Sequence, residues 1–210
     1  MSLSMGCLQY ERRYLIKNVG NVNSIVIVTD IFGLCQSTDS LVSFLSPRTE
    51  SVSIIEPYRG VRHSFKNEKA AYSAFVEKCG HDNYFDLVKS VVSDTNPDLL
   101  IGFSAGASVL WRLAAEKSLC CRPTILGFYP SRIREHLDVI PRHRIEIIFP
   151  IKEESFDVVS VRERVEKHEN VNTEITPYDH GFMNASSLAY DEGGESFGLA
   201  RINRYLDLMP

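Results

Sequence analysis

The stretch Gly102-Phe103-Ser104-Ala105-Gly106 decides how the rest of this sequence is interpreted, because of the segments on either side of it. Before it, Asp98-Leu99-Leu100-Ile101 is typical of a short strand, and after it residues 107–117 carry apolar side chains at helical spacing. A G-x-S-x-G pentapeptide between a strand and a helix predicts a nucleophile elbow. The two glycines leave room for the sharp turn, and the new helix directs its unpaired N–H groups toward Ser104. A chance G-x-S-x-G in a glycine loop is the alternative, and the flanking segments argue against it.

Length and charge limit the classes of protein that this chain can belong to. At 210 residues we expect a single domain over residues 1–210 with a sizeable core. The formal net charge is -4 with no block of like charges, so we expect no nucleic-acid partner. Apolar runs such as Ile25–Val28 are too short to span a bilayer, and the amino terminus lacks the pattern of a secretory signal. We therefore expect no membrane partner.

The cysteines indicate the compartment. Five of them stand at positions 7, 35, 79, 120 and 121, an odd number without metal-ligand spacing. The adjacent Cys120 and Cys121 could form a vicinal disulfide or a redox site, but we interpret them as reduced and structural. We expect a cytoplasmic protein that uses neither a metal nor an organic cofactor.

Short β-branched runs alternate with helical patterns along the chain, which predicts an α/β fold with a parallel sheet covered on both faces. The expected strands are Ile25–Thr29, Val52–Glu56, Leu99–Phe103, Ile125–Tyr129, Ile145–Phe149 and Val171–Thr176, with a further edge strand at Arg13–Ile16. The expected helices are Ser37–Leu45, Asn67–Cys79, Asn83–Ser93, Ala105–Ser118, Asp157–Glu169 and Glu195–Leu208. In such sheets ligands bind at the carboxyl ends of the strands, where we expect the functional residues.

Three groups suited to nucleophilic catalysis follow expected strands. They are Ser104, the acidic cluster Glu153, Glu154 and Asp157, and His180. A serine hydroxyl needs a neighbouring base, an imidazole accepts a proton near neutral pH, and a carboxylate behind the imidazole orients it. The order Ser, acid, His is that of α/β-hydrolases. Among the acids Glu154 is preferred, while all of them remain open as residues of a solvated loop that opens a helix.

Four segments carry a resemblance to a known family. They are Asp30-Ile31-Phe32-Gly33, the pentapeptide at 102–106, Gly127-Phe128-Tyr129-Pro130 and His180-Gly181-Phe182. In this order, at this chain length, they resemble the dienelactone hydrolase family of α/β-hydrolases. The resemblance implies an α/β-hydrolase fold with a mostly parallel central sheet, helices on both faces and no large lid domain.

The resemblance also implies roles for single residues. Ile31 matches the position whose backbone N–H forms half of an oxyanion hole, and the N–H of Ala105 is the other half. Asp30 matches an acidic residue near the nucleophile, and Glu154 matches the triad acid when counted back from Phe156. No metal ligand is implied.

The sequence also departs from the family pattern. The founding members use cysteine where this chain has Ser104, and they place aspartate and glutamate where it has Glu154 and Asp30. Asn184 replaces the arginine that binds the carboxylate of the lactone, which argues against dienelactone as the substrate.

The resemblance and the residues together predict a serine hydrolase that cleaves a small carboxylic ester, thioester or lactone through an acyl-enzyme. A peptidase or lipase is a weaker enzymatic alternative, because the chain leaves little room for a large lid. The alternative from another class is a non-catalytic α/β-hydrolase relative that acts as a binding module. Substrate specificity is expected in the loops Tyr58–Phe65, Pro130–Pro141 and Met183–Gly194; the sequence does not indicate the oligomeric state.

Overall fold

The computed structural model describes residues 12–15, 22–117, 119 and 122–208. Their strands form one seven-stranded sheet in the order β1-β3-β2-β4-β5-β6-β7. Strand β1 pairs antiparallel with β3 at one edge, and every other pairing is parallel. The mostly parallel sheet predicted from the alternating pattern is therefore confirmed. The strands are β1 Arg12–Leu15, β2 Val22–Val28, β3 Thr49–Ile55, β4 Leu99–Phe103, β5 Thr124–Phe128, β6 Ile145–Phe149 and β7 Val171–Ile175.

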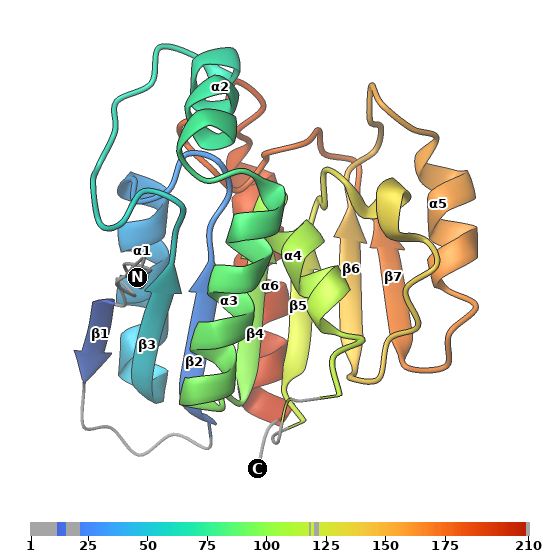
Figure 1. The fold of residues 1–210 in the computed structure, drawn as a ribbon, viewed down its shortest axis with the longest axis horizontal. Coiled ribbons are helices and arrows are strands. Elements are labelled where there is room, and N and C mark those ends of the chain that lie inside the picture. Colours follow the sequence, from blue (N-terminus) through green and yellow to red (C-terminus); the bar gives the residue numbers. More distant parts are fainter. Residues whose placement is uncertain (1–11, 16–21, 118, 120–121, 209–210) are drawn as a thin grey trace, which may run out of the picture.

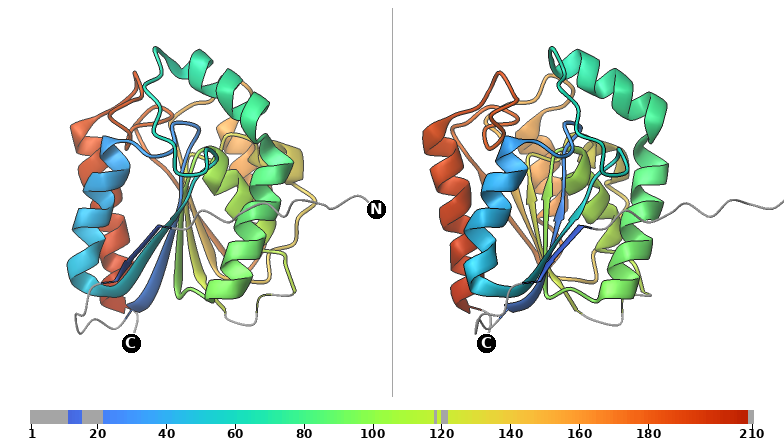
Figure 2. Two further views of the ribbon diagram at one scale, coloured as in Figure 1. Left: turned by 60° about the vertical axis from the view of Figure 1, so that its left-hand side comes forward. Right: turned by 90° about the vertical axis from the view of Figure 1, so that its left-hand side faces the viewer.

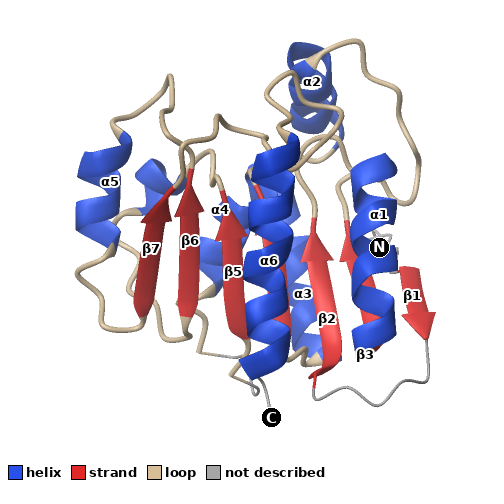
Figure 3. Cartoon of the chain, turned by 180° about the vertical axis from the view of Figure 1, so that it is seen from behind, coloured by secondary structure: helices blue, strands red, loops and turns tan. Residues whose placement is uncertain are grey.

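Helices cover both faces of this sheet, as Figures 1 and 2 show. Helices α1 and α6 lie on one face, seen in front in Figure 3, while α3, α4 and α5 lie on the other. Helix α2 lies beyond the carboxyl ends of the strands (Figure 1). The helices are α1 Gln36–Leu45, α2 Glu68–Lys78, α3 His81–Thr95, α4 Ala105–Leu113, α5 Val158–Val165 and α6 Glu192–Leu208, with short 3₁₀ turns at Ser46–Arg48 and Ile133–His136.

The core consists of two apolar clusters, one on each face of the sheet. Along β2, Val26 and Val28 pack in the cluster under α3, α4 and α5, whereas Ile25 and Ile27 pack in the cluster under α1 and α6. Alternate side chains of a strand point to opposite faces, so a continuous apolar run is the pattern of a strand buried on both sides. This explains why the β-branched runs were a sufficient signal for the central strands.

Some boundaries differ from the expected ones. Helix α4 ends at Leu113, short of the predicted end at Ser118. The carbonyl of Ala114 accepts hydrogen bonds from the N–H groups of Arg142 (2.6 Å) and His143 (3.2 Å), so it is already occupied where the helix would have continued. Ser118, Cys7, Cys120 and Cys121 lie outside the described residues, and among the described residues neither Cys35 nor Cys79 is part of a disulfide. Among the described residues, no helix combines the length and apolar character needed to cross a membrane.

Candidate active site

Ser104 occupies a strained turn between β4 and α4. Its backbone angles are φ 47° and ψ -107°, a conformation that residues other than glycine rarely adopt. The turn is tight because α4 starts directly against β2: a Cβ on Gly106 would lie 2.3 Å from the carbonyl oxygen of Val28. A Cβ on Gly102 would lie 2.9 Å from the backbone of Ala107. The glycines of the pentapeptide are thus required by backbone contacts, as a nucleophile elbow demands.

His180 lies next to this serine. Its Nε2 is 2.8 Å from Ser104 Oγ, a hydrogen bond between residues that are 76 positions apart in the chain. The imidazole stands on the loop after β7 and packs against the ring of Tyr129, with 5.1 Å between the ring centroids. The loop is tight at Gly181, which has φ 92° and no space for a Cβ beside Ser187. The structure therefore brings together the serine and the histidine that the sequence singled out.

The acid that contacts His180 is Glu153. Its Oε1 lies 2.5 Å from His180 Nδ1, and its side chain is only 11% exposed. The preference for Glu154 is thereby corrected: Glu154 lines the cleft but makes no hydrogen bond to His180. The loop after β6 is pinned to the histidine loop by a bond of 2.7 Å from the Ile151 N–H to the carbonyl of Tyr178, and Glu153 follows two residues later.

Asp157, the third acidic candidate, has a structural role. It is the N-cap of α5, and its carboxylate accepts a hydrogen bond of 2.8 Å from the backbone N–H of Ser160. The hydrogen bonds with Ser160 lower the pKa of this carboxyl group, as is usual for a helix cap. Asp157 therefore corresponds to the alternative of an acid in a loop that opens a helix.

Ala105 and Ile31 carry the two backbone N–H groups that are expected from the sequence to act as oxyanion donors. Ala105 is the first residue of α4, and Ile31 lies in the turn after β2, where it lines the same cleft as Ser104. Within the described part of the chain, neither N–H has a hydrogen-bond acceptor. The Asp30 carbonyl, which shares a peptide group with the Ile31 N–H, accepts a hydrogen bond of 3.2 Å from the Gly33 N–H, and the Ile31 carbonyl in the next peptide group accepts one of 2.5 Å from the Tyr58 hydroxyl. Both N–H groups are thus available to a negatively charged oxygen.

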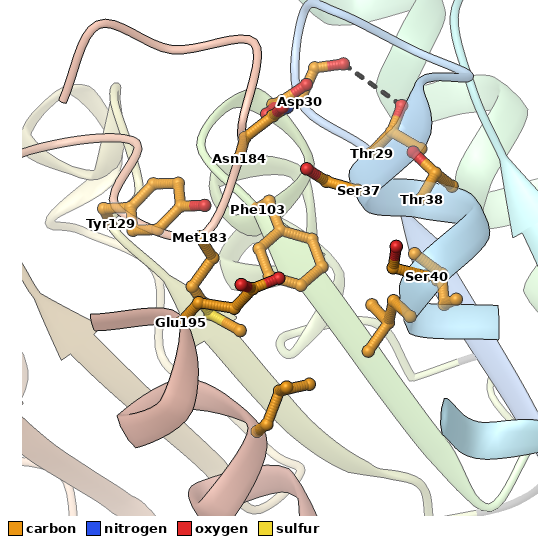
Figure 4. A pocket seen from close by; sticks show the side chains of 13 residues that line it. Thr29, Asp30, Ser37, Thr38, Ser40, Phe103, Tyr129, Met183, Asn184 and Glu195 are labelled. Atoms are coloured by element: carbon orange, nitrogen blue, oxygen red, sulfur yellow. Dashed lines mark hydrogen bonds between the residues drawn. The ribbon is translucent and has the colours of Figure 1, made fainter. Parts of the chain in front are cut away.

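Asp30 is close to this site but lies behind it. Its side chain is 6% exposed and accepts hydrogen bonds from the Phe32 N–H (2.9 Å) and from Asn184 Nδ2 (2.6 Å). Burial raises the pKa of this carboxyl group, while the two hydrogen bonds oppose that shift. Asp30 lines a small cavity of about 60 Å³ between α1 and α6, shown in Figure 4, rather than the cleft at Ser104.

The cleft that holds Ser104 and His180 has a volume of about 750 Å³ and mixed charge. Of the three loops in which specificity was expected, only Pro130–Pro141 contributes to it; the other walls come from α2, from the start of α3 and from the loops after β6 and β7. The lining residues are Ile31, Glu68, Lys69, Tyr72, His81, Ser104, Ser131, Arg132, Arg134, Glu135, Lys152, Glu153, Glu154, Ser155, Asp179 and His180.

His81, a residue that the sequence does not single out, also lines this cleft. Burial lowers its pKa to about 4, so the imidazole is neutral at neutral pH. Its ring packs edge-on against Phe75, with a centroid distance of 4.9 Å. No local pattern could have revealed this position, because it depends on how the α2–α3 corner folds over the sheet edge.

Comparison with other proteins places this geometry in context. No family model matches the chain. A sequence relative is the uncharacterized protein YczH of Bacillus subtilis (strain 168), 28% identical in an alignment of 136 residues that covers 61% of this chain. The match spans 64% of that relative, less than two thirds of its length.

Solved structures agree with the chain over nearly its whole length. A protein described as a dienelactone hydrolase from Klebsiella pneumoniae superimposes with a TM-score of 0.68 at 16% identity, covering 94% of this chain and 92% of that one. Est1E from Butyrivibrio proteoclasticus, solved with ferulic acid bound, gives a TM-score of 0.66 at 12% identity and covers 95% of both chains. At these identities the likeness is one of fold. The chain therefore has the α/β-hydrolase fold and is dienelactone hydrolase-like in its architecture.

Proposed function

We propose that this protein is a serine hydrolase that cleaves a small carboxylic ester, thioester or lactone through an acyl-enzyme. The observation that carries the proposal is a continuous chain of two hydrogen bonds. Ser104 Oγ lies 2.8 Å from His180 Nε2, and His180 Nδ1 lies 2.5 Å from Glu153 Oε1. This is the connectivity of nucleophile, base and orienting acid.

The first half of the reaction acylates the enzyme. Ser104 Oγ attacks the carbonyl carbon of the substrate while His180 Nε2 takes the hydroxyl proton, and the electron pair of the C=O bond moves to its oxygen. The N–H groups of Ile31 and Ala105 stabilise that oxyanion, and loss of one such donor costs about 10²–10³ in rate. The tetrahedral intermediate collapses, the bond to the leaving group breaks, and His180 returns the proton to that group.

The second half releases the acid. His180 Nε2 takes a proton from water, the hydroxide attacks the acyl carbon, and Ser104 recovers its proton as the ester bond to Oγ breaks. Glu153 lies beside His180 Nδ1 with its side chain only 11% exposed, and it stabilises the positive imidazolium in both halves. No step needs a group beyond these side chains, two backbone donors and water.

The alternative is a non-catalytic α/β-hydrolase relative that binds a ligand without turnover. Against it stands the strain at Ser104, where a φ of 47° costs about 1–3 kcal/mol for a residue other than glycine. A binding module has no need for a strained serine that contacts a histidine–glutamate pair. The structure of this turn therefore favours the enzymatic proposal.

Labelling with a fluorophosphonate tests the proposal, with the adduct located by peptide mass spectrometry. We expect one adduct on Ser104 in the wild-type protein and none in Ser104→Ala or His180→Ala. A panel of p-nitrophenyl esters, thioesters and lactones of increasing acyl length then identifies the substrate class. Correctly folded wild-type protein that neither labels nor hydrolyses any member of the panel would favour the binding module.

A further inference from the structure

A second hydrogen-bonded pair lies behind the candidate active site and links its two halves. Asn184 Nδ2 donates to Asp30 Oδ2 at 2.6 Å, and both residues are 6% exposed. Figure 4 shows them side by side at one end of the cavity, Asp30 on the loop after β2 and Asn184 on the loop after β7. These are the loops that carry Ile31 and His180.

The Asp30 end of the pair controls the turn that contains Ile31. The second carboxylate oxygen, Oδ1, accepts the N–H of Phe32 at 2.9 Å, and the Asp30 carbonyl accepts the N–H of Gly33 at 3.2 Å. Together these bonds enclose the Ile31 peptide. A shift of the carboxylate would therefore rotate the proposed oxyanion donor.

The Asn184 end of the pair controls the turn that follows His180. The Asn184 N–H donates to the Gly181 carbonyl at 2.9 Å, and Asn184 Oδ1 accepts the N–H of Ser186 at 2.9 Å. Cys35 Sγ, at 3.7 Å, also donates to Oδ1. The amide oxygen therefore accepts hydrogen bonds from Ser186 and Cys35, while the amide nitrogen donates to Asp30. Only one orientation of the amide satisfies all three partners.

From this arrangement we infer that Asp30 and Asn184 are positioning residues that set the placement of the Ile31 N–H relative to His180. The inference rests on the proposed function. Neither side chain lines the cleft at Ser104, so both act through the loops that they join. In the dienelactone hydrolase family that the sequence resembles, this position holds an arginine that binds the substrate. Here Asn184 is instead a neutral hydrogen-bond partner of the buried Asp30.

The chemistry of the pair provides a reciprocal test. In Asp30→Asn the new amide nitrogen would face a donor in either orientation, Asn184 Nδ2 or the Phe32 N–H, and in Asn184→Asp two carboxylates would face each other. In the double variant Asp30→Asn/Asn184→Asp, the new amide donates to the new carboxylate, its oxygen still accepts from Phe32, and the carboxylate still accepts from Ser186 and Cys35. Every hydrogen bond is preserved with its direction reversed only between the two side chains.

We would measure kcat and KM on the best ester, the rate of fluorophosphonate labelling and thermal unfolding for the wild type and these three variants. Because misplacing groups by about 1 Å can cost about 10²-fold in rate, we expect each single variant to lose about 10- to 100-fold in kcat with KM within about twofold. The double variant should recover to within about threefold of the wild-type kcat. Recovery by the swap separates positioning from a requirement for a carboxylate at residue 30.

An exposed pair of the same chemistry supplies the matched control. Near the carboxy-terminal end of α6, Asn203 Nδ2 donates to Asp207 Oδ2 at 3.2 Å in an exposed position. Figure 3 shows that this end of α6 lies opposite the carboxyl ends of the parallel strands. Asn203→Asp should leave kcat unchanged. If a single variant fails to fold, the double variant still decides the question.

Two outcomes overturn the inference: single variants with wild-type kcat, or a folded double variant as slow as the singles. Wild-type protein that does not label at all would instead refute the proposed function, and the two failures are thereby distinguishable.

Discussion

The exchange of Glu153 for glutamine tests the reasoning on the acid most directly. The substitution keeps the length of the side chain but removes the charge 2.5 Å from His180 Nδ1. If the amide nitrogen of the new glutamine turns toward His180, Nδ1 of the imidazole must accept its hydrogen bond. The ring proton then moves to Nε2. Ser104 would then face a donor where it needs a base.

The size of the effect follows from the geometry. Two unit charges about 4 Å apart interact by about 4 kcal/mol at an effective dielectric constant of about 20, a value suited to this partly buried pair. The charge on His180 forms only as Ser104 loses its proton, so the whole interaction acts on the transition state. At about 1.4 kcal/mol per factor of ten, we expect kcat to fall about 10³-fold.

The matched control is the neighbouring residue. Glu154→Gln removes the same charge from the same cleft without touching His180. We expect its kcat and its rate of fluorophosphonate labelling to stay within about threefold of wild type, since exposed charges are well screened. A loss in Glu154→Gln that equals or exceeds that in Glu153→Gln, with both variants folded by circular dichroism, would refute this account of the triad.

Three further results are expected. Gly106→Ala should prevent folding or cost at least about 3 kcal/mol, because its Cβ would lie 2.3 Å from the Val28 carbonyl oxygen. For Gly127→Ala the tightest contact is instead the end of the flexible Ile147 side chain at 3.0 Å, and urea denaturation compares the two variants. Ser104→Gly should be more stable than Ser104→Ala by about 1 kcal/mol in the same assay, because only glycine adopts φ 47° without strain; equal stabilities would contradict the strain. The pKa of His81 is lowered to about 4 in the folded protein, so the unfolded chain binds a proton at this residue more readily. The neutral His81 therefore contributes its full stabilisation above about pH 6.5, and this contribution is lost as the pH falls toward 4. In His81→Gln the free energy of unfolding should fall less steeply over this pH range.

The central strands were predictable because burial on both faces of a parallel sheet leaves a continuous apolar run. Leu99–Phe103 and Ile145–Phe149 have the predicted boundaries, and the remaining parallel strands differ by a few residues at their ends. The elbow was predictable for a similar reason, since its constraints act between neighbours in the chain. A cramped turn between strand and helix leaves a local signature of small residues.

Local sequence patterns cannot identify the acid that contacts His180 or the residues that line the cleft. Glu153 and Glu154 are adjacent in an irregular loop, where no periodicity tells which side chain points inward. The choice is made by the bond between Ile151 and Tyr178, which links two loops that are distant in sequence. Asn184 shows the same limit: it was recognised as a departure from the family pattern, while its partner Asp30 lies 154 residues away.

The strain of the described structure is concentrated at the edge of the sheet that carries the candidate site. Of the four described residues other than glycine with positive φ, Arg59, Ser104 and Tyr129 follow β3, β4 and β5; the fourth, Asn96, caps α3. The buried carboxylates Asp30 and Glu56 stand directly after the neighbouring strands β2 and β3. The strands that end there pack on both faces against the two apolar clusters, and such packing allows strained residues and buried carboxyl groups to persist. Strained residues and buried carboxyl groups lower the stability of a fold, so their concentration at this edge supports the proposal that the edge performs chemistry.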